Sequence, residues 1–134
     1  MTSMTRPELR LIEVARLRPL EGHGPKRVLW LRDKILSEGV WRVPLCVEAS
    51  RHLVMDGHHR FEVARLLGLS RVPAHVFTYD MVEVYSLRPN IPVSPEIIFA
   101  NDDAGVLFPY KTAKHRFPEI KEAFEGIALN ALKD

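Results

Sequence analysis

Residues 54–61 read Val-Met-Asp-Gly-His-His-Arg-Phe, and this stretch decides the fold because its hydrophobic pattern changes from strand to helix. Val54 and Met55 end a short apolar run, whereas from Phe61 onward apolar residues recur at helical spacing as far as Leu67. Gly57 permits a sharp turn between the two elements. The first N–H groups of a helix have no partner inside the helix, and the helix dipole adds positive charge there. The pattern therefore predicts a turn at 56–60 that binds phosphate or another anion.

The side chains of this turn suit the same chemistry. His58, His59 and Arg60 offer donors that can be cationic, and Asp56 could either cap the helix or hold Mg²⁺ beside the phosphates. The alternative interpretation is structural: an Asp N-cap followed by two histidines that face solvent. Neither a Gly-x-Gly-x-x-Gly pattern nor a Walker A motif is present, so the pattern alone leaves both interpretations open. Adjacent histidines diverge by about 100° on a helix, which argues against a shared structural metal.

Strands and helices are predicted to alternate along the rest of the chain. The expected strands cover 9–17, 43–47, 52–55, 72–77 and 82–85, and the expected helices cover 28–38, 58–67, 94–101 and 119–132. Such interleaving predicts an α/β or α+β fold in which helices flank a small mixed β-sheet. We expect residues 1–134 to form a single domain, with a core at about 9–118 followed by the C-terminal helix at 119–132.

Composition places the chain among globular proteins. Its 134 residues are 46% hydrophobic and 27% charged, with a formal net charge of +2, so charge alone predicts no strong sequence-independent binding to nucleic acid. The single cysteine, Cys46, excludes an internal disulfide and is expected to be a small buried residue. The sequence has neither a long apolar span nor a signal-peptide pattern, so we expect a cytoplasmic protein without a membrane partner.

Two further segments carry candidate functional groups. Lys111-Thr112-Ala113-Lys114-His115-Arg116 holds four residues that can be cationic, which suits recognition of a phosphate or carboxylate. The alternative is a solvated basic loop. Glu21 lies on a glycine-flanked loop between a predicted strand and a predicted helix, where a carboxylate could act as a general base. The alternative there is an ordinary surface glutamate.

These segments together resemble a known family. The 54–61 stretch, followed by Leu67-Gly68-Leu69 and Val72-Pro73, resembles the nucleotide-binding core of the ParB/sulfiredoxin-like superfamily, and more narrowly its free L-serine kinases, including siderophore-pathway members. Arg18-Pro19-Leu20-Glu21 resembles the family's Pro-x-Glu, and residues 111–116 resemble its Lys-Thr-Thr-Arg-His. In this chain Ala113 and Lys114 replace the second Thr and the Arg of that motif.

The resemblance implies transfer of a phosphoryl group from ATP or ADP to the hydroxyl of free L-serine, with Mg²⁺ as cofactor. It implies that Glu21 accepts the hydroxyl proton and that Asp56 holds Mg²⁺ and takes part in catalysis. Gly57, His58, His59 and Arg60 would bind the nucleotide phosphates, with the two histidines and the arginine neutralising developing charge. Lys111, Thr112 and His115 would bind phosphate or the carboxylate of serine. A homodimer is plausible.

Other members of the superfamily offer alternatives. Sulfiredoxin chemistry needs a reactive cysteine at the turn that corresponds to residues 56–60, here called the anion turn, where this chain has His58. ParB-type partition proteins pair the domain with a helix-turn-helix module, and the residues after Phe117 are too few to form one. A catalytically inactive nucleotide-binding regulator without a DNA-binding module stays open, because Ala113 and Lys114 depart from the kinase motif.

Overall fold

A four-stranded mixed β-sheet lies at the centre of the protein, in a computed structural model that describes residues 7–133. Its strands, in spatial order, are β1 (Glu8–Glu13), β5 (Arg71–Phe77), β3 (Leu45–Glu48) and β4 (Val54–Asp56). The β1–β5 and β3–β4 pairs are antiparallel, and β3 runs parallel to β5. The predicted small mixed sheet is therefore confirmed.

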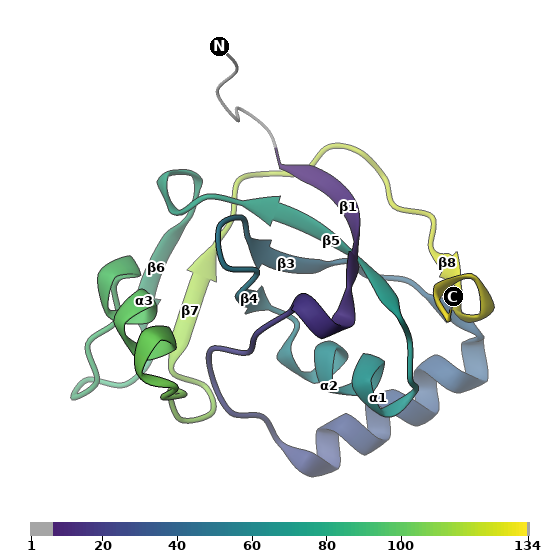
Figure 1. The fold of residues 1–134 in the computed structure, drawn as a ribbon, viewed down its shortest axis with the longest axis horizontal. Helices are drawn as coiled ribbons and strands as arrows, with labels where there is room; N and C mark the ends of the chain where they lie inside the picture. The colour runs from purple at the N-terminus through teal and green to yellow at the C-terminus, as the bar shows by residue number, and fades with distance from the viewer. Residues whose placement is uncertain (1–6, 134) are drawn as a thin grey trace.

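Two helices, α1 (Pro25–Glu38) and α2 (His58–Leu66), pack against each other and lie together against this sheet, as Figure 1 shows. Val28 and Ile35 of α1 and Phe61 of α2 are buried in one core with side chains of β3 and β5. Gly39 ends α1 with a φ of 68°, as the sequence predicts. The helical periodicity of both segments thus reflects a shared buried face.

The remaining elements lie at two ends of the sheet. At one end, α3 (Pro95–Ala104) packs near the two-stranded sheet of β6 (Glu83–Ser86) and β7 (Ala113–Arg116) (Figure 1). At the other, β2 (Val40–Trp41) pairs with β8 (Ile127–Ala128). Short 3₁₀ helices complete the structure: η1 (Val14–Arg16), η2 (Tyr79–Met81) and η3 (Leu129–Leu132). No helix within residues 7–133 is long and apolar enough to cross a membrane.

The predicted C-terminal helix at 119–132 is wrong. The chain instead crosses to β8 and then forms η3. Its apolar residues pack in separate places: Ile120 lies against the cluster around Phe77, whereas Leu129 and Leu132 enter the main core. Gly126, with a φ of 98°, lies outside helical conformation and directly precedes β8. Tertiary packing therefore overrides local helix propensity here.

Three smaller expectations also change. The strand predicted over 9–17 ends at Glu13, and η1 follows it. The basic stretch at 111–116 is largely the strand β7 rather than a solvated loop. Cys46 is half-buried rather than fully buried, and its partial burial raises the pKa of the thiol to about 12.

Candidate active site

A cavity of about 380 Å³ opens where four segments meet. These are the loop carrying Glu21, the first turns of α1, the turn from β4 into α2, and residues 110–114. The lining includes Glu21, Arg27, Asp56, Gly57, His58, His59, Arg60, Tyr110, Lys111 and Lys114. Most of the predicted site residues, although far apart in sequence, therefore share one cavity.

The anion turn has the backbone geometry that the sequence predicts. Gly57 adopts a φ of 102°, and a Cβ atom there would stand 2.6 Å from the Leu45 side chain, so glycine is required for two reasons. The first hydrogen bond within α2 runs from the Phe61 N–H to the Gly57 carbonyl at 2.8 Å. The preceding N–H groups have no intrahelical acceptor and lie at the cavity.

The capping role considered for Asp56 is wrong. The N-cap residue of α2 is Gly57, and no side chain caps the helix. Asp56 is the exposed last residue of β4 and lines the cavity instead. A carboxylate beside the predicted phosphate-binding turn would fit Mg²⁺, which usually takes one or two carboxylates together with phosphate oxygens and water.

Glu21 is not a surface glutamate. Its exposed fraction is 7%, and its carboxylate accepts hydrogen bonds from the N–H groups of Thr112 at 3.2 Å and Ala113 at 3.3 Å. Lys111, with a φ of 60°, turns the chain so that successive N–H groups point at the carboxylate. Burial raises the pKa of Glu21, and these hydrogen bonds partly oppose the shift. A carboxylate with a raised pKa in a cavity is a candidate proton acceptor.

The two histidines of the turn are neutral acceptors rather than cations. His58 Nε2 accepts a hydrogen bond from the Leu20 N–H at 3.3 Å, and His59 Nε2 accepts one from the Gly24 N–H at 3.0 Å. Burial lowers the pKa of His58 to about 3 and also lowers the pKa of His59. The structure thus places both rings as acceptors for the 20–24 loop, in contrast to the expected cationic donors, and each ring is partly buried rather than turned fully to solvent.

Residues 111–116 divide between the cavity and the protein interior. Lys111 and Lys114 line the cavity. The Thr112 hydroxyl donates to the Pro109 carbonyl at 2.6 Å and accepts from Arg88 Nε at 3.1 Å, so it is already engaged. His115 is buried, with Nε2 2.9 Å from the Tyr79 hydroxyl, and neither residue lines the cavity. Burial lowers the pKa of His115 to about 4. Thr112 and His115 therefore lie in the protein interior next to the residues that line the cavity.

Arg27 and Tyr110 line the cavity and are missing from the residues that the sequence singled out. A signal for Arg27 was available: the first turn of α1 holds Lys26 and Arg27 and no acidic residue. Cations at a helix N-terminus oppose the helix dipole, so such a placement indicates an anionic ligand. Tyr110 packs edge-on against His59 with ring centroids 5.2 Å apart, a contact that spacing cannot reveal.

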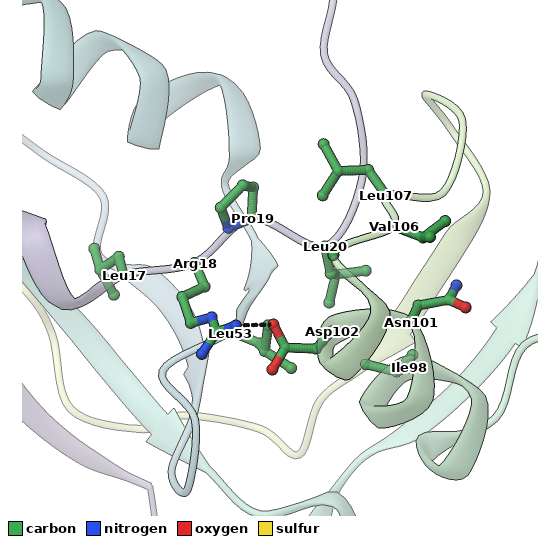
Figure 2. A pocket seen from close by; sticks show the side chains of 11 residues that line it. Leu17, Arg18, Pro19, Leu20, Leu53, Ile98, Asn101, Asp102, Val106 and Leu107 are labelled. Carbon is green, nitrogen blue, oxygen red and sulfur yellow. Dashed lines mark ion pairs between the residues drawn. The ribbon is translucent and has the colours of Figure 1, made fainter.

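A second cavity, of about 220 Å³, lies beside the segment that precedes Glu21 (Figure 2). Figure 2 shows Leu17, Pro19 and Leu20 along one wall, with Arg18 paired to Asp102 of α3 at 2.9 Å. None of the predicted site residues lines it. Its walls brace the Glu21 loop through Leu20, which is buried against Leu53.

Comparisons with known proteins agree with this picture, although no protein-family model matches the sequence. Over 73 residues the chain is 41% identical to a Staphylothermus marinus protein named ATP-dependent L-serine kinase, a match covering 52% of this chain and 29% of that protein. The chain thus spans less than a third of that relative's length.

Two solved structures share the fold. One is a free serine kinase in complex with AMP, with a TM-score of 0.81 and 15% identity over 92% of this chain and 93% of that chain. The other is SbnI with a C-terminal truncation from Staphylococcus aureus, with a TM-score of 0.81 and 14% identity over 93% of this chain and 89% of that chain. The predicted resemblance to free serine kinases is therefore confirmed at the level of the fold.

Proposed function

We propose that this protein is a nucleotide-dependent kinase that phosphorylates free L-serine to O-phospho-L-serine. The observation that carries the proposal is that one cavity is lined both by the buried Glu21 and by residues 57–60, the start of α2, where the N–H groups before Phe61 have no intrahelical acceptor. A proton acceptor facing an anion turn is the arrangement that phosphoryl transfer to a hydroxyl requires. The named serine kinases that share sequence and fold support the choice of acceptor.

The reaction would proceed by direct transfer. Glu21 accepts the proton of the serine hydroxyl as the hydroxyl oxygen attacks the terminal phosphorus. The bond from that phosphorus to the bridging oxygen breaks, which releases ADP from ATP, or AMP if ADP is the donor. Because burial raises its pKa, Glu21 is a stronger base than an exposed carboxylate. The relative that is 41% identical is named an ATP-dependent kinase, which favours ATP as the donor.

Charge stabilisation would come from the groups around the turn. The N–H groups at the start of α2, together with Arg27 and Arg60, would hold the transferring phosphates. Lys111 and Lys114 would bind phosphate or the serine carboxylate. Asp56 would hold Mg²⁺, which, when bound, neutralises charge on the phosphate oxygens. Thr112 and His115, expected as direct ligands, would instead support this surface from behind.

The proposed partners are therefore a nucleotide and a small amino acid, and the proposed setting is the cytoplasm. A net charge of +2 gives no reason to add nucleic acid to them. A homodimer stays a prediction.

The test is direct detection of product. The protein is incubated with Mg²⁺, L-serine and ATP or ADP, and O-phosphoserine is measured by mass spectrometry. Glu21→Gln keeps the size of the side chain but removes the base, so we expect a loss of about 10²- to 10⁴-fold in kcat. Glu119→Gln, at an exposed loop position, is the matched control and should keep full activity. Equal activity in both variants would exclude Glu21 as the base.

A second candidate function is an inactive nucleotide-binding regulator. It is favoured by the two backbone N–H groups that already bind the Glu21 carboxylate, because such a carboxylate could serve only to hold residues 111–113 in place. This alternative predicts no O-phosphoserine with either donor, while ATP or ADP still raises the melting temperature.

A further inference from the structure

The loop that carries Glu21 is held to the anion turn at two points. The Leu20 N–H donates to His58 Nε2 at 3.3 Å, and the Gly24 N–H donates to His59 Nε2 at 3.0 Å. Leu20 immediately precedes Glu21, and Gly24 follows it by three residues. The two imidazoles thus bind the loop on both sides of the carboxylate.

We propose that His58 and His59 are positioning residues, which fix the 20–24 loop against the start of α2 so that Glu21 faces the bound phosphates. This inference rests on the proposed kinase function for its catalytic consequence. Their part in catalysis is indirect: each ring accepts a backbone hydrogen bond through Nε2, and the backbone places the carboxylate.

The helix geometry explains why two adjacent histidines are used. Side chains at neighbouring helical positions diverge by about 100°, so the rings leave α2 in different directions. They can therefore reach two backbone N–H groups that lie four residues apart in one loop. Each ring must also be a neutral imidazole with its hydrogen on Nδ1, because only an unprotonated Nε2 can accept.

Other contacts hold the loop to a different part of the molecule. Beyond the histidines, the Gly22 N–H donates to the Phe108 carbonyl at 3.0 Å, and Glu21 accepts from Thr112 and Ala113. These contacts join the loop to the 108–113 side of the cavity. The hydrogen bonds to His58 and His59 join it to the phosphate turn. Since a displacement of about 1 Å can cost roughly 100-fold in rate, this second attachment sets the distance that catalysis needs.

The kinetic test compares removal of the acceptor with its replacement. His59→Leu fills the space with an apolar side chain that has no acceptor. His59→Gln instead places an amide oxygen near the position of Nε2. We expect His59→Leu to lower kcat roughly 10- to 100-fold, with the nucleotide Kd changed less than about threefold. His59→Gln should recover most of the loss. The same pair is made at His58, and His75→Gln on β5 is the control.

The opposite pattern would overturn the proposal. If the histidines bind phosphate directly, both Leu variants raise the nucleotide Kd while kcat at saturating nucleotide stays close to wild type. Both rings are partly exposed, so if His58→Leu does not fold, the His59 pair decides the question.

A second measurement does not depend on activity. In ¹⁵N NMR spectra, both rings should show the neutral tautomer protonated at Nδ1. Amide hydrogen exchange at Gly24 should accelerate about tenfold or more in His59→Leu and much less in His59→Gln. If wild-type protein forms no O-phosphoserine but exchange responds in this way, the kinase proposal fails while the attachment stands. Unchanged exchange at Gly24 in His59→Leu would refute the attachment itself.

Discussion

The turn at 56–60 and the basic segment at 111–116 both look cationic in the sequence, yet the folded protein places their side chains differently. At the turn, Gly57 begins α2, and the N–H groups that precede Phe61 have no acceptor within the helix. In the basic segment, Lys111, Ala113 and Lys114 line the cavity, while Thr112 and His115 are buried. The difference teaches that a backbone anion site is encoded locally, whereas a run of basic residues gains its meaning from the surface against which it folds.

The largest effect expected from the turn is on folding. Gly57→Ala would place a Cβ atom 2.6 Å from Leu45 at a φ of 102°. Strain and overpacking should together lower the free energy of unfolding by about 2 to 4 kcal/mol, measured by urea denaturation. Gly39→Ala, at a φ of 68° with open space around it, is the control and should lose about 1 kcal/mol. Equal losses would show that the close approach to Leu45 is unimportant.

The buried histidine of the basic segment, His115, should make the free energy of unfolding depend on pH. The pKa of His115 is lowered to about 4 in the folded protein, against about 6.5 when unfolded, so the unfolded state binds the proton first. The contribution of His115 to stability is therefore full at neutral pH and falls as the pH decreases through this window, by about 2 kcal/mol between pH 7 and pH 5. Denaturation of wild type and His115→Gln across this range isolates the contribution. A variant with the same slope as wild type would contradict the assignment.

The smallest expected effect compares one arginine from each region. Arg60 lines the cavity, and Arg60→Ala should weaken nucleotide binding about tenfold, or roughly 1.4 kcal/mol, in a calorimetric titration. Arg116 points outward to Glu83 at 3.4 Å, and Arg116→Ala should leave nucleotide affinity unchanged. If Arg60→Ala binds nucleotide normally, the anion site has been placed on the wrong surface.

The sequence-based predictions were accurate where structure depends on neighbouring residues and failed where it depends on distant ones. The strand, glycine turn and helix at 54–66 were predicted correctly, as was the start of the helix expected at 94–101, where Ser94 accepts from the Ile97 N–H. Each of these features depends on residues that lie within a few positions of one another in the sequence. The helix predicted at 119–132 was wrong, because Ile120 and Leu132 belong to two separate cores.

The candidate site was predicted in part for the same reason. Glu21, Lys111 and the 56–60 turn were singled out from sequence, and they share one cavity. The sequence did not predict the charge state of His58 or the interior position of His115, since both follow from burial by distant segments. Arg27 was missed although its unfavourable place at a helix N-terminus was visible.

The sequence by itself determined the shape of the 56–60 turn, because the positive φ of Gly57 and the lack of intrahelical acceptors for the first N–H groups of α2 are properties of consecutive residues. Only the tertiary structure decided the chemistry of the groups around it. Glu21 meets the amide of Thr112, 91 residues away in the chain, and that contact and its burial have opposing effects on the pKa of the carboxylate. Burial also keeps His58 and His59 neutral, so that they hold the loop as acceptors. Desolvation depends on every atom that surrounds a group, and no local pattern records those neighbours.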